Sequence, residues 1–299
     1  MNITLQDIAQ FNQLDLLAKQ LVDGFITGLH KSPYHGFSVE FAEHKLYNAG
    51  ESTKHIDWKV FGRTDRLYTK RYEEETNLRC HLLIDQSPSM FYPTGSHDKI
   101  KFAVLSAASI AHMLIKQRDA VGVTMFSDKI DFQSEQKSTS SHLHRLLQTM
   151  GEALESPARG NTDITTVLHE IAEKAHKRSL IVLFTDMFQQ GASEDLYSAL
   201  QHLKHNLNEV IVFHVSDYST ELEFEFADRP SKFVDLETGQ TIKLNPYSIK
   251  QEYKNEMAKF YKEIKLRCGM LKVDFVEVNT ADPFDKVIGS FLIKRKKMR

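Results

Sequence analysis

From residue 79 onward, short apolar runs alternate with longer segments whose apolar residues follow a helical period. Over residues 99–116, apolar side chains recur at i, i+3, i+4 and i+7, which predicts an amphipathic helix. The same period predicts helices over residues 143–154, 164–175, 193–205 and 249–266. Short apolar runs predict strands over residues 79–84, 121–126, 129–132, 179–184, 209–215 and 271–278. This alternation indicates an α/β protein with a mostly parallel sheet covered by helices on both faces.

Two stretches depart from the alternation. Residues 1–78 begin with a helix-like segment and continue as short aromatic runs, which predict a small, partly β subdomain packed on the sheet. Residues 219–246 predict a β insertion, in which Thr238 and Gly239 form part of a hairpin turn. We therefore divide the chain into an N-terminal subdomain, residues 1–78, and a sheet domain, residues 79–299.

Charge and composition narrow the class of protein. The 299 residues include 38 basic and 40 acidic side chains, and a net charge of −2 gives no cationic field that would favour DNA. All apolar runs are far shorter than the ~18 residues that suggest a membrane span. Two cysteines and an N-terminus without an apolar signal core favour the cytoplasm. The basic segment 294–299 has two interpretations, a solvated terminus or a contact with RNA or an anionic membrane face.

Candidate chemistry gathers where strands end. Asp85, Ser87 and Ser89 form an Asp-x-Ser-x-Ser loop directly after the first predicted strand of the sheet domain. Asp186 follows a later strand, and Thr162 lies in a loop before a helix. Ligands of open parallel sheets bind beyond the carboxyl ends of strands, so the two strand-end segments are expected to meet there, within reach of the Thr162 loop. We expect Thr162 and Asp186 to lie in solvent-facing loops.

The side chains of this set offer only hard oxygen atoms, from two carboxylates and three hydroxyls. Such donors suit Mg²⁺, or Mn²⁺ as an alternative. Because the protein supplies few ligands, an octahedral ion would keep waters and one position open for an acidic group of a partner. The ordinary alternative is that the two aspartates cap helices and the serines occupy turns. The order of the three segments favours a metal site.

The order and context of these five residues resemble the metal-ion-dependent adhesion site of von Willebrand factor A domains, over about residues 79–290. The resemblance implies a doubly wound, mostly parallel sheet with helices on both faces. It also implies that Ser87, Ser89 and Thr162 contact the cation directly, and that Asp85 and Asp186 do so directly or through water. One departure is residue 187, a methionine where many members of the family carry glycine.

The N-terminal residues extend the resemblance to the bacterial DUF58 family, in which such a region precedes a von Willebrand A-like domain. The matching motifs are Gly28-x-His30-x-Ser32, Gly36-x-Ser38-x-Glu40-Phe41, Tyr47-Asn48-Ala49-Gly50-Glu51, Ile56-Asp57-Trp58-Lys59, Arg63-Thr64 and Glu73-Glu74-Glu75. Two residues depart from the family pattern, Lys45 for arginine and Glu51 for aspartate. Lys45 cannot form the bidentate fork of an arginine.

The resemblance implies a binding and adaptor module and not an enzyme. DUF58 proteins are linked with MoxR-type AAA+ ATPases, so the expected partners are such an ATPase and a client protein that supplies an acidic side chain. The expected output is remodelling or maturation of a client complex. The alternative is a Mg²⁺-dependent hydrolase or phosphoryl-transfer enzyme that uses the same metal, with Asp163 as a possible base. The sequence has no phosphate-cradling P-loop motif, which favours the first hypothesis.

Other polar residues favour structural roles. We expect Trp58 to anchor the N-terminal subdomain and Asp57 to pair with Arg63, in preference to a catalytic acid beside an arginine. Cys80, within a strand, predicts a buried and inert thiol. The histidine pairs His142/His144 and His202/His205 have no third ligand nearby in the sequence, so we expect them to be solvated surface residues.

Overall fold

The computed structural model describes residues 14–16, 18–19, 38–47, 56–75, 78–93, 98–154, 164–186, 194–236 and 238–282, with backbone only for 38–45 and 70–75. The chain folds into two compact units, residues 30–78 and residues 1–29 together with 79–299. The functional division into residues 1–78 and 79–299 stays a prediction. Within the described residues, no helix combines the length and the apolar character needed to cross a membrane.

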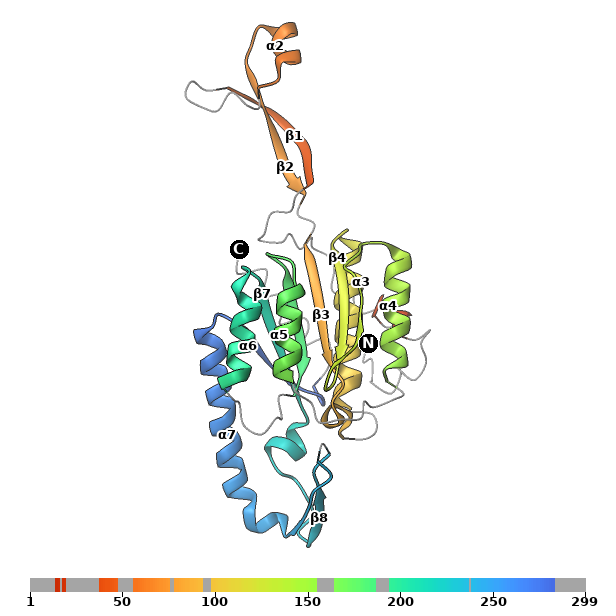
Figure 1. Ribbon diagram of the computed structural model, residues 1–299, viewed down its shortest axis with the longest axis vertical. Coiled ribbons are helices and arrows are strands. Elements are labelled where there is room, and N and C mark those ends of the chain that lie inside the picture. Colours follow the sequence, from red (N-terminus) through yellow and green to blue (C-terminus); the bar gives the residue numbers. More distant parts are fainter. Residues whose placement is uncertain are drawn as a thin grey trace. The chain divides into compact units, whose positions relative to one another are not determined.

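The larger unit contains a six-stranded sheet in its described part (Figure 1). Its strands are β3 (Arg79–Asp85), β4 (Ala120–Phe126), β5 (Ile130–Gln133), β6 (Leu180–Thr185), β7 (Glu209–Ser216) and β10 (Asp274–Asn279). They lie in the order β10-β7-β6-β3-β4-β5, and every neighbouring pair is parallel except β4–β5. From β3 the chain adds β4 on one side and returns to add β6 on the other, so the strand order reverses between β3 and β6. Ligand sites of open α/β sheets lie at such a reversal.

Helices cover both faces of this sheet. They are α3 (Lys99–Lys116), α4 (Ser140–Glu152), α5 (Ile164–Lys174), α6 (Glu194–His205) and α7 (Pro246–Met270). Leu83, Ile181 and Leu183 form one core cluster with side chains of α5, α6 and α7. Their neighbours along the strands, such as Leu82 and Val182, are also fully buried and point to the opposite face, where α3 contacts β3 and β4. The predicted α/β fold, with a doubly wound, mostly parallel sheet, is confirmed.

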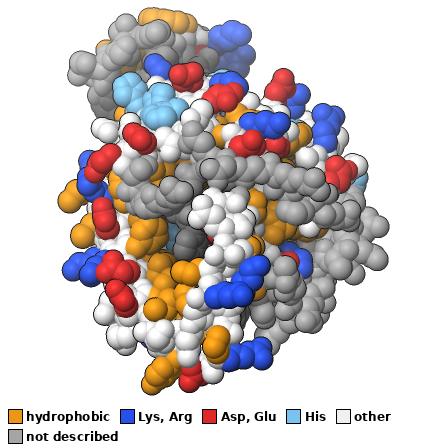
Figure 2. Space-filling model, turned by 60° about the horizontal axis from the view of Figure 1, so that its bottom comes forward, with side chains coloured by type: hydrophobic (Ala, Val, Ile, Leu, Met, Phe, Trp, Pro, Cys, Tyr) orange, Lys and Arg blue, Asp and Glu red, His pale blue; other side chains and the backbone are white. Residues whose placement is uncertain are grey.

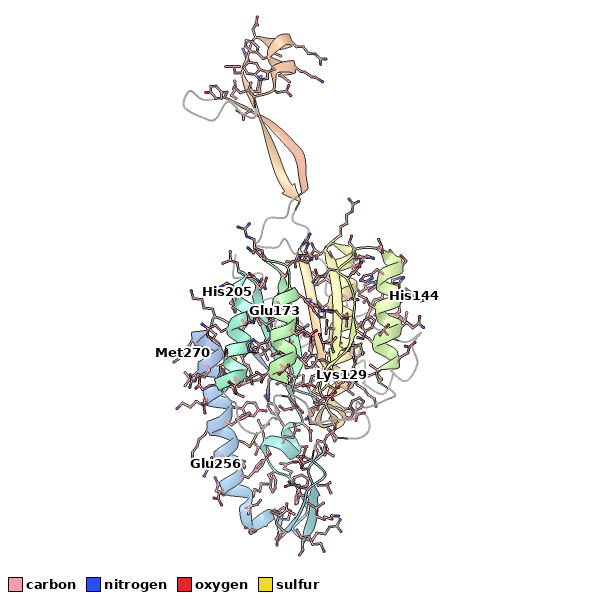
Figure 3. The ribbon with its side chains drawn as sticks, in the orientation of Figure 1. Lys129, His144, Glu173, His205, Glu256 and Met270 are labelled. Carbon is pink, nitrogen blue, oxygen red and sulfur yellow. The ribbon has the colours of Figure 1, made fainter. Side chains whose placement is uncertain are left out.

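Element boundaries differ from the prediction mainly at α7. This helix begins at Pro246, earlier than the predicted 249, because Asn245 caps it by accepting a hydrogen bond from the Tyr247 amide at 3.0 Å. It also runs on to Met270, so β10 begins three residues later than predicted. Figure 3 labels Glu256 and Met270, two exposed residues of this helix that point away from the sheet. The long exposed face of α7 explains why apolar periodicity underestimated its length.

The segment between β7 and α7 is only partly β. It begins with a short π-helix, η4 (Tyr218–Leu222), where the sequence predicted a strand-rich insertion. The antiparallel hairpin of β8 (Ser231–Val234) and β9 (Thr241–Leu244) follows, and its turn contains Gly239 with a φ of +71°. Figure 2 views this end of the unit and shows hydrophobic side chains interspersed with lysines and arginines.

The smaller unit, residues 30–78, contains the antiparallel pair β1 (Ser38–Leu46) and β2 (Tyr68–Glu75), and the short helix α2 (Trp58–Thr64). One sequence expectation is wrong here and one stays a prediction. Asp57 caps α2, accepting hydrogen bonds from the amides of Lys59 at 3.0 Å and Val60 at 3.2 Å, and its pairing with Arg63 is still a prediction. Trp58 is 64% exposed and so does not anchor the unit. The motifs at 28–32 and 48–51 lie outside the described residues.

Candidate metal centre

The predicted site residues that the structure describes lie at the reversal of strand order. Ile84 and Phe184 are paired across β3 and β6, so Asp85 and Asp186 leave the sheet side by side. The Gln86 amide donates a 2.7 Å hydrogen bond to the Phe126 carbonyl, which ties the loop after β3 to the carboxyl end of β4. Lys129, labelled in Figure 3, lies in the turn after β4 at this end of the sheet. Asp85 and Asp186 therefore lie near each other at the carboxyl ends of their strands, as the sequence predicted.

Asp85 organises the first loop. One carboxylate oxygen, Oδ1, accepts a 2.8 Å hydrogen bond from the Ser87 amide, and Oδ2 accepts a 2.6 Å bond from the Thr185 hydroxyl. The loop then turns through the 3₁₀-helix η3 (Pro88–Phe91), which brings the Ser87 and Ser89 hydroxyl oxygens to 3.0 Å from each other. The Asp-x-Ser-x-Ser segment is thus a tight turn that gathers its three side chains.

Asp186 completes the cluster from the other strand. The Ser89 hydroxyl donates a hydrogen bond to its carboxylate, so the two strand ends are joined directly. The Lys99 Nζ atom lies 2.8 Å from Asp186 Oδ2 and 2.5 Å from Glu221 Oε1. Asp85 and Asp186 are only 3% and 2% exposed, so the expectation of a solvent-facing loop is wrong for Asp186.

Sequence reasoning missed Lys99 and Glu221. Lys99 is the first residue of α3, where a lysine is ordinarily solvated, but here its side chain is fully buried. Glu221 lies on η4, which had been assigned to a β insertion. The one sequence signal for a buried Lys99 was its position at the start of a helix that is apolar on almost every side.

The two aspartates are electrostatically unequal. Burial, followed by the nearby charge of Asp186, raises the pKa of Asp85 to about 6. Burial acts the same way on Asp186, but the charge of Lys99 and its hydrogen bond outweigh it and hold the pKa of Asp186 below its usual value. The cluster therefore contains one carboxylate neutralised by an ammonium and a second whose negative charge is poorly compensated.

This inequality predicts a pH dependence of stability. The pKa of Asp85 is 3.8 in its ordinary environment and about 6 here, so the folded protein binds more protons than the unfolded chain between these values. We expect the free energy of unfolding to fall by about 1–3 kcal/mol as the pH rises from about 4 to about 6. Asp186 does not contribute in this window because its pKa is lowered. Urea unfolding at several pH values measures this free energy. Asp85→Asn should remove most of its fall between about pH 4 and about pH 6. The same fall in the variant and the wild type would show that Asp85 is not its source.

The donors fit a hard divalent cation. Asp85, Ser87, Ser89 and Asp186 supply carboxylate and hydroxyl oxygens, and uncompensated charge at Asp85 favours a cation nearby. In the described part of the chain, no group of three or more His, Cys, Asp or Glu residues is arranged to hold a metal, so serine hydroxyls are needed for this centre. The predicted ligand Thr162 lies outside the described residues, as do Asp163 and Met187.

Other candidates have structural roles. His142 is 6% exposed and its Nε2 lies 2.9 Å from the Val121 carbonyl oxygen, so its predicted surface location is wrong. His202 is half-buried and its Nδ1 lies 3.0 Å from that of His169. His144 and His205 are exposed, as predicted. Cys80 is buried, also as predicted, and forms no disulfide.

The chain belongs to the DUF58 family. The model of this family, described as "Protein of unknown function DUF58", matches residues 43–263, which include the strand ends and loops described above. The membership that the sequence motifs indicated is therefore confirmed.

Two curated relatives are similar over part of the chain. Uncharacterized protein Rv1480 of Mycobacterium tuberculosis and uncharacterized protein Mb1516 of Mycobacterium bovis are each 24% identical over 178 residues. The matched segment covers 60% of this chain and 56% of each relative, so the chain spans little more than half the length of these proteins.

Similar solved structures include two of different origin. The conserved hypothetical protein BatB from Bacteroides thetaiotaomicron is 15% identical with a TM-score of 0.45, over 74% of this chain and 99% of that one. The VWA domain of SpRpn10 is 11% identical with a TM-score of 0.41, over 71% of this chain and 94% of that domain.

Proposed function

We propose that this chain is a metal-dependent protein-interaction module. It binds Mg²⁺, with Mn²⁺ as the alternative ion, through Asp85, Ser87, Ser89, Thr162 and Asp186, and it binds a partner through the partner's acidic side chain. The observation that carries this proposal is the convergence of two buried carboxylates and two hydroxyls where the strand order reverses.

Each described side chain has a definite part in this function. Asp85, held by the Ser87 amide and the Thr185 hydroxyl, offers a fixed and poorly compensated negative charge. Ser87 and Ser89 present adjacent hydroxyl oxygens, and Ser89 links this pair to Asp186. When bound, the cation supplies an open coordination position that attracts a carboxylate. The partner therefore needs an exposed Asp or Glu.

Family resemblance supports the identity of the partners. The proposed working partner is a MoxR-type AAA+ ATPase, and the client is a protein whose complex is remodelled or matured in the cytoplasm. The chain then acts without chemical turnover of its own. The ATPase supplies the energy, and this module supplies cation-dependent recognition.

Calorimetric titration with Mg²⁺ tests the metal site. The wild type should bind the ion, and the variant Asp85→Ala/Ser87→Ala should bind at least roughly tenfold more weakly because a charge and a hydroxyl ligand are lost. Ser127→Ala is the matched control, since Ser127 is a buried serine after β4 that hydrogen bonds to Asp131 at 2.8 Å outside the proposed ligand set. Equal affinity in all three proteins would refute the site. Phosphate-ester turnover that Asp85→Ala abolishes would favour a hydrolase instead.

A further inference from the structure

Lys99 places a positive charge inside the candidate metal centre. Its side chain is 0% exposed, and its Nζ atom lies between a predicted metal ligand and a residue of the insertion, 2.8 Å from Asp186 Oδ2 and 2.5 Å from Glu221 Oε1. A buried ammonium is retained in a protein only where carboxylates or other acceptors compensate it. Lys99 therefore already serves as a cation for Asp186.

Glu221 connects this ammonium to η4. While Oε1 contacts Lys99, the other carboxylate oxygen, Oε2, accepts a 2.8 Å hydrogen bond from the Asp217 amide. The Tyr253 hydroxyl, on α7, donates a 3.0 Å hydrogen bond to the Glu221 carbonyl. The side chain of Glu221 thus joins the metal centre to the N-cap residue of η4, and its backbone joins η4 to α7.

A metal ion and Lys99 would share one carboxylate. Lys99 contacts Asp186 in a buried region where water screens charges little. A metal ion bound to the same carboxylate would repel the Lys99 ammonium, and each cation would weaken the other's contact with Asp186. Glu221 already contacts Lys99 at 2.5 Å, so Lys99 keeps one carboxylate partner if a metal draws on Asp186. Glu221 is therefore placed to relieve the competition when a metal binds.

We propose that Lys99 is an internal cation that competes with Mg²⁺ for Asp186, and that metal binding leaves Lys99 paired with Glu221 alone and so tightens η4. This inference rests on the proposed function, because it requires a metal at the centre. It assigns Lys99 the role of setting the metal affinity and Glu221 the role of carrying metal occupancy to the insertion between β7 and α7.

Mg²⁺ titrations of four full-length proteins test the competition. Lys99→Met should bind Mg²⁺ at least about tenfold more tightly than the wild type, because the competing charge is gone while the apolar length of the side chain is kept. Glu221→Gln should bind more weakly, because Lys99 then depends more on Asp186. Lys101→Met is the matched control, a lysine of the same helix that pairs with Asp98 at 3.0 Å, and its affinity should stay within about twofold of the wild type.

Amide hydrogen exchange tests the tightening of η4. Mg²⁺ should slow exchange of the Asp217 amide, whose acceptor is Glu221 Oε2, in the wild type and in Lys101→Met. The ion should leave this exchange unchanged in Lys99→Met. Slowing of equal size in all three proteins would overturn the proposed link.

The outcomes separate this inference from the proposed function. Equal Mg²⁺ affinity in the wild type and Lys99→Met would overturn the competition and leave the metal site intact. If only Lys99→Met among the four proteins binds Mg²⁺, the competition is upheld, but the wild type is not metal-dependent and the proposed function is overturned. No binding by any of the four proteins would overturn both. If Lys99→Met does not fold, Glu221→Gln decides, and an affinity equal to or above that of the wild type overturns the competition.

Discussion

Replacing Lys99 by methionine is expected to lower the free energy of unfolding in metal-free buffer by about 3–5 kcal/mol. The substitution leaves the Asp186 and Glu221 carboxylates in a nearly water-free site without the ammonium that contacts both at 2.8 Å and 2.5 Å. In a unit of this size, each kcal/mol lowers the midpoint of thermal unfolding by roughly 2–4 °C, so a fall of about 6–20 °C is expected. Thermal and urea unfolding followed by circular dichroism measure both quantities.

Lys101→Met is the control for this effect as well. Lys101 lies on the same helix, but its side chain is 28% exposed and its ion pair with Asp98 is close to the surface. Its loss should cost less than about 1 kcal/mol. Similar stability losses in the two variants would show that the buried ion pairs of Lys99 do not hold the site together.

Partner capture should depend strongly on the metal and its ligands. Thr162→Ala and Ser89→Ala should each weaken binding of a purified MoxR-type AAA+ ATPase by roughly 30-fold or more, because truncating one side of a buried ionic contact typically costs ~2–5 kcal/mol. Asp186→Ala should weaken binding too, but Asp186 also compensates Lys99, so this variant combines a binding loss with a stability loss. A fluorescence binding titration measures each affinity, with circular dichroism as the folding control.

Chelation provides the comparison for these variants. EDTA should weaken wild-type binding as much as the substitutions do, and it should change the variants little further. Ser127→Ala should bind as the wild type does, since its hydroxyl lies outside the ligand set. Metal-independent binding with normal affinity in both ligand variants would exclude the metal centre as the docking surface. The exposed face of α2, with Trp58 and Arg63, would then be the next surface to test.

Hydrophobic periodicity predicted the sheet domain well because its strands and helices are buried in regular ways. β6 is buried at every position, and α5 buries a single stripe, so both give the patterns on which sequence reasoning depends. α7 was underestimated because few of its 25 residues are buried. α2 was missed because a seven-residue helix with no buried residue leaves no periodic signal.

The part of the candidate centre that lies at strand ends could be predicted from the sequence. Asp85 and Asp186 follow adjacent parallel strands, and that topology alone brings them together. Lys99 and Glu221 were not predictable, because their contact spans 122 positions along the chain and depends on the path of η4. His142 shows the same limit, since its burial depends on a carbonyl oxygen of a strand 21 positions away.

The exposure of Trp58 has a practical consequence for following this protein in solution. The chain contains one tryptophan, and it lies on α2 of the smaller unit with 64% of its surface exposed. Intrinsic tryptophan emission is therefore a label-free probe of the unit that contains α2. Far-ultraviolet circular dichroism, which is dominated by the sheet and its helices, reports on the other unit. Denaturation curves recorded by the two methods will coincide only if the two units lose their structure in one cooperative step.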